Sequence, residues 1–356
     1  MCLSLVGSEM CIRDRTHGKT TTTSMLSWIL EDNNYRPSFL IGGAPRDFDS
    51  SARLTASKFF VIEGDEYDSA FFDKRPKFIH YYPKISIINN IEFDHADIYK
   101  DLNEIIFQFH QLIRLVPSNG KIIYNGDDKN TADLIDFGHW CDTESYGSRS
   151  DCEWRADIGS RNKIEIYHKD FNHFSSDWLL KGSYNKQNAL SAIIAANTIG
   201  ISPDKSLDSL KRFSGVKRRF ELLGNFNGLV IYDDFAHHPT SIKKTLDDIA
   251  ELYPEKIVSV SIELRSNTMR RGIHNDNLLR FMKPLKHVTF LSSPEIASKI
   301  SSHTDFDDKT MHVFDSPNNL ASHLLSEFNS DFVHVFLSNG DFMGAKEQVM
   351  SKLRKK

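Results

Sequence analysis

The residues with the clearest chemical meaning lie near the start of the chain, in the segment Gly18-Lys19-Thr20-Thr21. A glycine lets the backbone curl so that successive N–H groups face phosphate oxygens, while lysine offers a positive charge and threonine a hydroxyl for Mg²⁺. The strict spacing of a phosphate loop would place a further glycine at position 13, which holds Arg13. The segment predicts a phosphate-binding loop, and the alternative is a Gly-Lys turn before a threonine-rich helix.

Acidic and imidazole side chains follow two apolar runs farther along the chain. The run 59–66 ends in Glu63-Gly64-Asp65-Glu66, and the run 84–95 ends in Asp94 and His95. Oxygen ligands suit a hard cation, and a histidine can join a second ion site. Thr20, Glu63 and His95 therefore predict a metal–phosphate site at one edge of a sheet. The alternatives are a solvated acidic loop and a surface imidazole.

Two polar segments in the second half also follow apolar runs. One is 233–239, which includes His237 and His238, and the other is 265–272, which carries three arginines. The histidine pair does not predict zinc, because no third Cys or His lies at ligand spacing. The forked guanidinium groups of the arginine segment suit carboxylates and phosphates, and the alternative is a solvated basic loop.

The elements that position these residues alternate between strand and helix. A helix is expected over 103–115, where Ile105, Phe109 and Leu112 recur at helical spacing, and another over 185–200, ending at Gly200. Its core-facing residues would be Ala189, Ala192, Ile193 and Ala196. The expected strands are the runs 59–66, 84–95, 121–128, 229–235, 257–263, 287–293 and 332–341. This alternation predicts mostly parallel α/β sheets, whose function gathers at the carboxyl ends of the strands.

The length of 356 residues favours two domains. A basic stretch over 212–221 interrupts the alternation, so we expect one domain over 16–214 and a second over 215–356. The first would be a P-loop-type domain and the second a Rossmann-like α/β domain.

Composition narrows the class of protein. The formal net charge of −4 argues against a general nucleic-acid binder or a polybasic membrane protein. The four cysteines show neither C-x-x-C spacing nor disulfide density, which favours a reducing cytoplasm and no structural zinc. The expected partners are small molecules, with neither nucleic acid nor membrane among them.

Residues 1–15 do not match what a phosphate loop needs before it. Such a loop normally follows a buried strand rich in Val and Ile, whereas E-M-C-I-R-D-R stands here, which we expect not to form a buried parallel strand. The segment is interpreted as a non-native leader, with an ordinary flexible N-terminus as the alternative. The loop would then lack its anchoring strand.

Taken together, these motifs resemble the Mur ligase family, the ATP-dependent amide ligases of peptidoglycan assembly. The resemblance rests on T-H-G-K-T-T (16–21), E-G-D-E-Y-D-S (63–69), N-N-I-E-F-D-H-A-D (89–97), Y-N-K-Q-N-A-L (184–190), G-V-K-R-R-F-E (215–221) and Y-D-D-F-A-H-H-P-T (232–240), which occur in the family's order.

The resemblance implies a role for each matching residue. The ATP phosphates would lie on Thr16, His17, Gly18, Lys19, Thr20 and Thr21. Magnesium would be held by Thr20, Glu63 and His95, and Lys19, Glu63 and His95 would serve catalysis. Asn185 and Asn188 would lie near the adenine, Arg219 near the phosphates and Asp234 near the ribose. His237, Arg265, Ser266, Asn267 and Arg270 would face the incoming amine substrate.

The implied reaction has two steps. ATP phosphorylates the lactyl carboxylate of UDP-N-acetylmuramate, and the amine of a murein tripeptide then attacks the acyl-phosphate. Free L-alanine as the amine is the alternative within the family. Outside it, the alternatives are a P-loop NTPase or small-molecule kinase, and a non-catalytic nucleotide-binding remnant.

The sequence also departs from the family. Arg15 stands where the family has a glycine, Leu264 where a proline is usual, and no segment before Thr16 matches the family's UDP-sugar domain. From these departures we expect that the 356 residues alone do not ligate.

Overall fold

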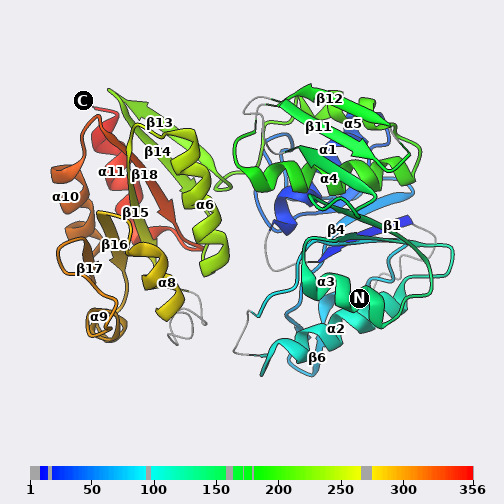
Figure 1. Cartoon of the computed structure of the whole chain (residues 1–356), viewed down its shortest axis with the longest axis horizontal. Helices are drawn as coiled ribbons and strands as arrows, with labels where there is room; N and C mark the ends of the chain where they lie inside the picture. The colour runs from blue at the N-terminus through cyan, green and yellow to red at the C-terminus, as the bar shows by residue number, and fades with distance from the viewer. Residues whose placement is uncertain are drawn as a thin grey trace. The chain divides into compact units, whose positions relative to one another are not determined.

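The computed structural model describes residues 9–14, 18–93, 98–157, 163–170, 172–178, 180–265 and 275–355, with the backbone alone at 9–14 and 275. The chain divides into two compact units, Met1–Lys217 and Arg218–Lys356, each of them α/β (Figure 1). The division falls within the basic stretch at 212–221.

The first unit is built on a ten-stranded sheet. Its strands are β1 (Glu9–Asp14), β2 (Ser38–Leu40), β3 (Ala52–Arg53), β4 (Phe59–Glu63), β7 (Ile85–Ile88), β8 (Lys121–Asn125), β9 (Asp142–Gly147), β10 (Trp154–Asp157), β11 (Lys163–His168) and β12 (His173–Asp177). Their order is β12-β11-β10-β9-β8-β7-β1-β4-β2-β3. The pairs from β2 to β10 are parallel, so the polar residues that follow β4, β7 and β8 reach one edge of the sheet.

The sequence-based expectation for residues 9–15 is wrong in one respect. β1 lies between β4 and β7 and pairs parallel with both, with Cys11 opposite Val61 and Ile85. Ladder hydrogen bonds come from the backbone, so two apolar neighbours can hold a strand of mixed composition between them. The gap that we expected before the phosphate loop is therefore filled.

The antiparallel additions to this sheet were not predicted. β3, β11 and β12 pair antiparallel with their neighbours at its two edges. β5 (Asp68–Ala70) and β6 (Asp73–Pro76) form a separate hairpin directly after β4, followed by the 3₁₀ helix η1 (Lys77–His80). β3, β5 and β6 are short and polar, so a single sequence carries little signal for them, whereas the alternation of the buried Ile164 and Ile166 in β11 was a strand signal that was not used.

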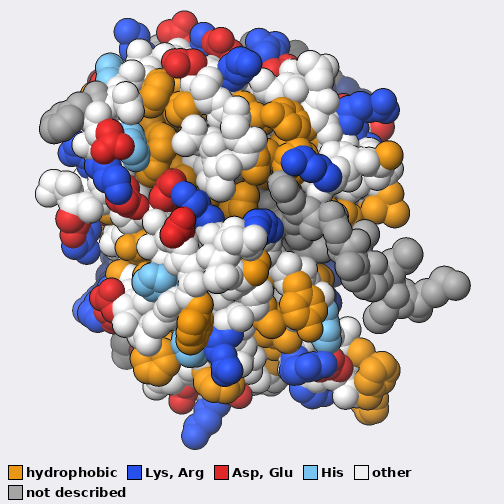
Figure 2. Space-filling model, turned by 90° about the vertical axis from the view of Figure 1, so that its right-hand side faces the viewer, with side chains coloured by type: hydrophobic (Ala, Val, Ile, Leu, Met, Phe, Trp, Pro, Cys, Tyr) orange, Lys and Arg blue, Asp and Glu red, His pale blue; other side chains and the backbone are white. Residues whose placement is uncertain are grey.

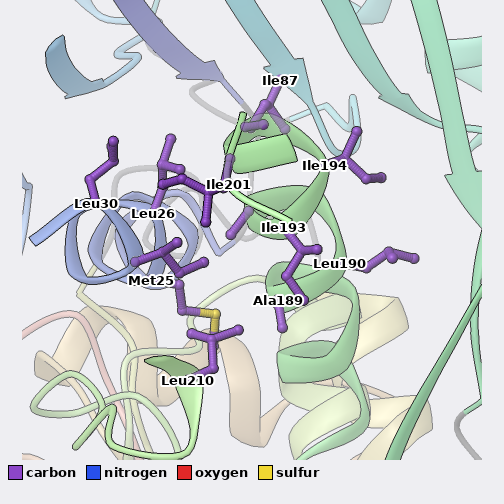
Figure 3. Close-up of a cluster of buried hydrophobic side chains, with 14 of the residues drawn as sticks. Met25, Leu26, Leu30, Ile87, Ala189, Leu190, Ile193, Ile194, Ile201 and Leu210 are labelled. Atoms are coloured by element: carbon purple, nitrogen blue, oxygen red, sulfur yellow. The ribbon is translucent and has the colours of Figure 1, made fainter. Parts of the chain in front are cut away.

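The core of the first unit lies around α1 (Lys19–Asp32) and α4 (Ser183–Thr198), which pack against each other. Figure 3 shows Met25 and Leu26 of α1 facing the helix that carries Ala189 and Ile193. The predicted buried face of α4 is confirmed, but its other sides are buried too. The reason is that α4 also contacts β7, β8, β9 and β10.

Two helices of this unit begin or end at residues that satisfy their terminal backbone groups. Gly200 closes α4 with a left-handed φ of 96°, and the N–H of Ile201 donates to the Ala196 carbonyl at 3.0 Å, which confirms the predicted end. The predicted helix over 103–115 is α2 (Leu102–Leu115), and the Asp101 side chain caps it by accepting from the Glu104 N–H at 3.1 Å. The remaining helices of this unit are α3 (Lys129–Phe137) and α5 (Pro203–Leu210).

The second unit is a six-stranded sheet with helices. Its strands are β13 (Glu221–Phe226), β14 (Leu229–Asp234), β15 (Ile257–Glu263), β16 (His287–Leu291), β17 (Met311–Phe314) and β18 (Phe332–Leu337), in the order β13-β14-β18-β15-β16-β17. All pairs are parallel except β13 with β14. The helices are α6 (Pro239–Leu252), α8 (Asn275–Met282), α9 (Pro294–Ser301), α10 (Pro317–Glu327), α11 (Ala345–Leu353) and the 3₁₀ helix η2 (Phe342–Gly344).

The surface agrees with a mixed, nearly balanced charge. On the face drawn in Figure 2, acidic and basic side chains lie close to one another, with hydrophobic side chains between them. Among the helices described here, none has both the length and the apolar character that a membrane span requires.

A buried polar network ties three strands of the second sheet together. His334 of β18 is fully buried, with Nδ1 2.9 Å from the Ser259 hydroxyl and Nε2 3.2 Å from the Ser261 hydroxyl, both on β15. Ser261 in turn lies 2.6 Å from the hydroxyl of Thr289 on β16. Burial lowers the pKa of His334 to about 3, so the imidazole is neutral in the folded protein at neutral pH.

This burial makes stability depend on pH in a defined direction. Unfolded His334 binds a proton below about pH 6.5, whereas the folded residue does so only near its lowered pKa, so stability falls as pH drops through that interval. We expect the wild type to lose about 2 kcal/mol more of its unfolding free energy than His334→Gln between about pH 7.5 and about pH 5. Denaturant titrations at both pH values measure this difference.

The matched control is His139→Gln, because His139 is exposed in the segment that follows α3. It should keep the pH dependence of the wild type. Equal pH dependence in the wild type and His334→Gln would contradict the assignment.

Candidate active site

The predicted phosphate loop leads directly into α1. Gly18 has a left-handed φ of 81°, which a residue with a side chain rarely adopts, and its carbonyl accepts the Thr22 N–H at 3.1 Å to begin the helix. Lys19 and Thr20 occupy the first helical turn, where N–H groups and the helix dipole favour an anion. The backbone of Gly18 and of the first turn of α1 is therefore compatible with the predicted phosphate site, which stays a prediction.

Glu63 links this turn to another loop. It is the last residue of β4, and its Oε1 accepts the Thr20 hydroxyl at 3.1 Å while its Oε2 accepts the Gly42 N–H at 2.7 Å. A Cβ at position 42 would lie 2.8 Å from Glu63 Oε2, so a larger residue there would displace the Glu63 carboxylate. One carboxylate therefore holds the first turn of α1 and the loop after β2 at a fixed distance from the end of β4.

Lys19 forms an ion pair with Glu66, three residues beyond Glu63. The side chain of Glu66 is 6% exposed, and its backbone carbonyl accepts a hydrogen bond from the Tyr99 hydroxyl. Lys77 holds the neighbouring Asp65 at 2.5 Å. A phosphate that binds at this turn would meet a lysine already directed by a carboxylate.

The donors at this edge fit a hard divalent cation in kind. Thr20 and Glu63 offer a hydroxyl and a carboxylate oxygen within hydrogen-bond distance of each other, and Mg²⁺ takes such ligands together with phosphate oxygens. Within the part of the chain that the structure describes, no cluster of three His, Cys, Asp or Glu side chains could hold a metal alone. His95, the third predicted ligand, lies outside the described residues.

Asn185 and Asn188 lie together on the first turns of α4. Asn188 Nδ2 is 3.4 Å from Asn185 Oδ1, and Asn185 Nδ2 donates to the Lys181 carbonyl at 2.6 Å. Both residues are buried, and α4 packs on the helix that carries Lys19. The structure therefore brings the two asparagines together, while their predicted contact with adenine stays a prediction.

In the second unit, Asp234 fixes two stretches of backbone at the end of β14. Its Oδ2 accepts the Phe220 N–H at 2.6 Å and its Oδ1 accepts the Ala236 N–H at 2.7 Å. Charge-assisted hydrogen bonds of this kind are the strong ones. Asp234 is buried, and in this structure its carboxylate fixes the backbone at Phe220 and at Ala236, next to Phe235.

Arg219 and His237 both contact Phe235. The Arg219 guanidinium carbon lies 4.5 Å from the centre of the Phe235 ring, and the His237 ring packs against that ring edge-on. His237 Nδ1 is 2.9 Å from the Phe235 carbonyl, and because a carbonyl only accepts, Nδ1 carries a proton. Arg219, Asp234 and His237 thus form one cluster.

Arg265 stands just beyond the end of β15 and above a buried carboxylate. Glu263, the last residue of β15, accepts the Ser338 hydroxyl and, at 3.0 Å, the Phe342 N–H. The Arg265 guanidinium lies 3.7 Å from Asp341, and its side chain is 59% exposed, which leaves it able to meet an anionic ligand. A Cβ on Gly340 would lie 2.6 Å from both Arg265 Nη1 and Glu263 Oε2.

Some of the predicted site residues lie together, some lie apart, and some are outside the described residues. The structure brings together Gly18, Lys19, Thr20, Thr21 and Glu63 in the first unit, and Arg219, Asp234 and His237 in the second. Asn185 and Asn188 lie together on the first turns of α4, and Arg265 lies just beyond the end of β15. Thr16, His17, His95, Ser266, Asn267 and Arg270 lie outside the described residues.

Sequence reasoning missed two carboxylates that organise this chemistry. Glu66 lies in the predicted acidic motif but was not singled out, although it pairs with Lys19. Glu263 is the last residue of a predicted strand, directly before the arginine segment, and that position was the available signal. The Glu263 partners Ser338 and Phe342 are 75 and 79 residues away, which no local pattern reveals.

The packing of Gly43 on Thr20 yields a test by paired substitutions. A Cβ at position 43 would lie 2.6 Å from Thr20 Cγ2, so we expect Gly43→Ala to lower the unfolding free energy by about 1–3 kcal/mol. Thr20→Ser removes Cγ2 and keeps the hydroxyl, so the double variant Gly43→Ala/Thr20→Ser should regain most of that loss. Denaturant titration of the wild type, both single variants and the double variant measures this; no recovery in the double variant would contradict it.

Comparison with known proteins identifies the family. The profile of the Mur ligase middle domain matches residues 16–196, and that of the Mur ligase glutamate ligase domain matches residues 218–340. A UDP-N-acetylmuramate–L-alanyl-γ-D-glutamyl-meso-2,6-diaminoheptandioate ligase of Escherichia coli K12 is 38% identical over 98% of this chain and 78% of its own length.

Two further comparisons bear on the substrate and the fold. A UDP-N-acetylmuramate–L-alanine ligase of Clostridium kluyveri is 38% identical over 68% of this chain and 52% of its own length. The crystal structure of a murein peptide ligase from Psychrobacter arcticus superposes with a TM-score of 0.74 at 34% identity, covering 98% of this chain and 78% of that one. These matches and the α/β architecture agree, and the chain belongs to the Mur ligase family.

Proposed function

We propose that this chain is an ATP-dependent amide ligase that joins UDP-N-acetylmuramate to the tripeptide L-alanyl-γ-D-glutamyl-meso-diaminopimelate, in the recycling of peptidoglycan. The observation that carries the proposal is the extent of similarity. The E. coli ligase named for this reaction matches 98% of the chain, whereas the L-alanine ligase of C. kluyveri matches 68%.

The geometry of the first unit supports the ATP step. A carboxylate does not become an amide directly, because its oxygen is too poor a leaving group, so the lactyl carboxylate of the sugar nucleotide attacks the γ-phosphorus and ADP leaves. Lys19 would turn from Glu66 to the phosphates, and Gly18 and the start of α1 would supply N–H groups. Mg²⁺, held by Thr20, Glu63 and His95, would neutralise charge on the phosphates when bound.

The second step needs a positioned amine and little water. The tripeptide amine attacks the acyl carbon, and phosphate leaves with the carboxyl oxygen. Arg265 supports the binding of the tripeptide, because its exposed guanidinium can pair with a carboxylate and the peptide carries several. We assign Ser266, Asn267, Arg270 and His237 to the same binding task, and Asn185, Asn188, Arg219 and Asp234 to ATP.

The first test is a complete assay on the full chain with Lys19→Ala as its matched variant. Amide product, detected by mass spectrometry, should require ATP, UDP-N-acetylmuramate and tripeptide together. Lys19→Ala should lower the rate about 10²–10³-fold with the circular dichroism spectrum unchanged, because it removes an electrostatic contact to phosphate and little core packing.

Each alternative has its own outcome in this assay. A preference for L-alanine over tripeptide would move the chain to the sister ligase, and ADP release that needs neither amine nor sugar nucleotide would indicate an NTPase. Binding of an ATP analogue without product would favour a non-catalytic nucleotide-binding protein. Absence of product with all three substrates present would instead agree with the expectation, drawn from the sequence, that these 356 residues do not ligate alone.

The second test concerns substrate choice. Arg265→Ala should raise the KM for tripeptide about 30-fold, which corresponds to about 2 kcal/mol of binding, and change the KM for ATP far less. Arg280→Ala is the control, because Arg280 is exposed on α8 of the same unit. Equal effects of Arg265→Ala on both substrates would mean that Arg265 is structural.

A further inference from the structure

Two residues in left-handed conformation flank Arg219, which the proposed function assigns to the ATP phosphates. Arg218 has a φ of 59° and Phe220 a φ of 51°, and neither is a glycine. Left-handed backbone is sterically unfavourable for residues with a side chain, so the surroundings must hold it. The Arg218 N–H donates to Glu221 Oε2 at 2.5 Å and the Phe220 N–H to Asp234 Oδ2 at 2.6 Å.

The Arg218 side chain adds further attachments within the same unit. Its Nη2 donates to the Ser338 carbonyl at 2.7 Å, at the end of β18, and its Nε lies 3.5 Å from Asp233 Oδ2. Its backbone carbonyl accepts the Phe235 N–H at 2.8 Å. Arg218 therefore spans the ends of β14 and β18, and the Phe235 ring below it is the same ring on which Arg219 lies.

Asp233 is the centre of this network. Its side chain is 2% exposed, and Lys346 Nζ, from α11, lies 2.5 Å from Oδ2. Burial raises the pKa of Asp233, and the charges of Lys346 and Arg218 oppose that rise. Within the described residues, Asp233 Oδ1 and Arg218 Nε have no hydrogen-bond partner, so the network relies on charge at close range.

We propose that Arg218, held by Asp233 and through it by Lys346, is a positioning residue that fixes the conformation of Arg219, the residue to which the proposed function assigns the ATP phosphates. The inference rests on the proposed function, because it takes from there the role of Arg219. Arg218 itself is committed to Ser338 and Asp233, so it acts through Arg219 and not on the nucleotide. Lys346 is a second cation at Asp233 Oδ2, the same oxygen that lies near Arg218 Nε, and it fixes the position of that carboxylate.

A double-mutant cycle on nucleotide binding tests this. The full chain is titrated with the non-hydrolysable analogue AMP-PNP and Mg²⁺ in a calorimeter, which does not depend on ligase turnover. Arg219→Ala and Arg218→Met should each weaken binding about tenfold, and the double variant should bind no more weakly than Arg219→Ala. Arg218→Lys, which keeps the charge but not the fork, should regain only part of the loss.

A second pair of variants tests the support from α11. Lys346→Met should weaken binding about fivefold, because the Asp233 carboxylate loses its attachment to α11 and no longer holds Arg218 in one place. Lys352→Met is the matched control, since Lys352 is exposed on the same helix, and it should bind as the wild type does. Thermal unfolding of each variant shows that it folds, and Lys346→Met remains a test if Arg218→Met does not fold.

The outcomes separate the two proposals. If Arg219→Ala leaves binding unchanged, the phosphate role of Arg219 in the proposed function is wrong, and the inference is overturned with it. If Arg219→Ala weakens binding but Arg218→Met or Lys346→Met does not, the inference alone is wrong. Additive losses in the double variant would also overturn it, because they would show that Arg218 acts independently of Arg219.

Discussion

The carboxylate of Glu63 is the constraint on which the candidate site of the first unit depends. It stands at the end of a buried parallel strand and accepts hydrogen bonds from the Thr20 hydroxyl and the Gly42 N–H at once. Each of these partners is also constrained by volume, since a Cβ at 42 would meet Glu63 and a Cβ at 43 would meet Thr20. The phosphate-loop turn, the loop after β2 and the end of β4 therefore cannot move independently.

The second unit has the same arrangement, in which a carboxylate at the end of a strand accepts a hydrogen bond from a loop N–H group. Asp234 ends β14 and holds the Phe220 N–H, and Glu263 ends β15 and holds the Phe342 N–H. Both of these phenylalanines have a left-handed φ, of 51° and 55°. A strand-end carboxylate thus stabilises a backbone conformation that the held residue would not adopt readily on its own.

Local sequence signals account for much of this architecture. Strands such as β4, β14, β15 and β18 were predicted because each is a short apolar run closed by polar residues, and α2 because its apolar residues recur at helical spacing. The motif residues around Gly18 and Glu63 were predicted to converge because parallel strands end at one edge of the sheet, and these described residues do so.

What could not be predicted depends on distant partners. β1 is a strand because β4 and β7 flank it, and its own composition argues otherwise. Lys346 lies 113 residues from Asp233 along the chain, and Ser338 lies 120 residues from Arg218. Pairs of this kind arise only when β14, β18 and α11 have assembled, so no local pattern marks them.

The carboxylates at the strand ends hold loop backbone as well as facing the candidate site, and this limits what their substitution can show. Removing Glu63 or Asp234 would abolish a proposed ligand contact and also leave a backbone N–H group without its acceptor, and removing Glu263 would have the second effect. A loss of activity in such variants would not distinguish catalysis from loop geometry. Lys19 and Arg265 differ because their charged ends do not hold a distant N–H group through a strand end. Loss of activity in Lys19 or Arg265 variants therefore measures the effect of charge at the site. Loss of activity in variants of the three carboxylates includes the effect of a changed loop conformation.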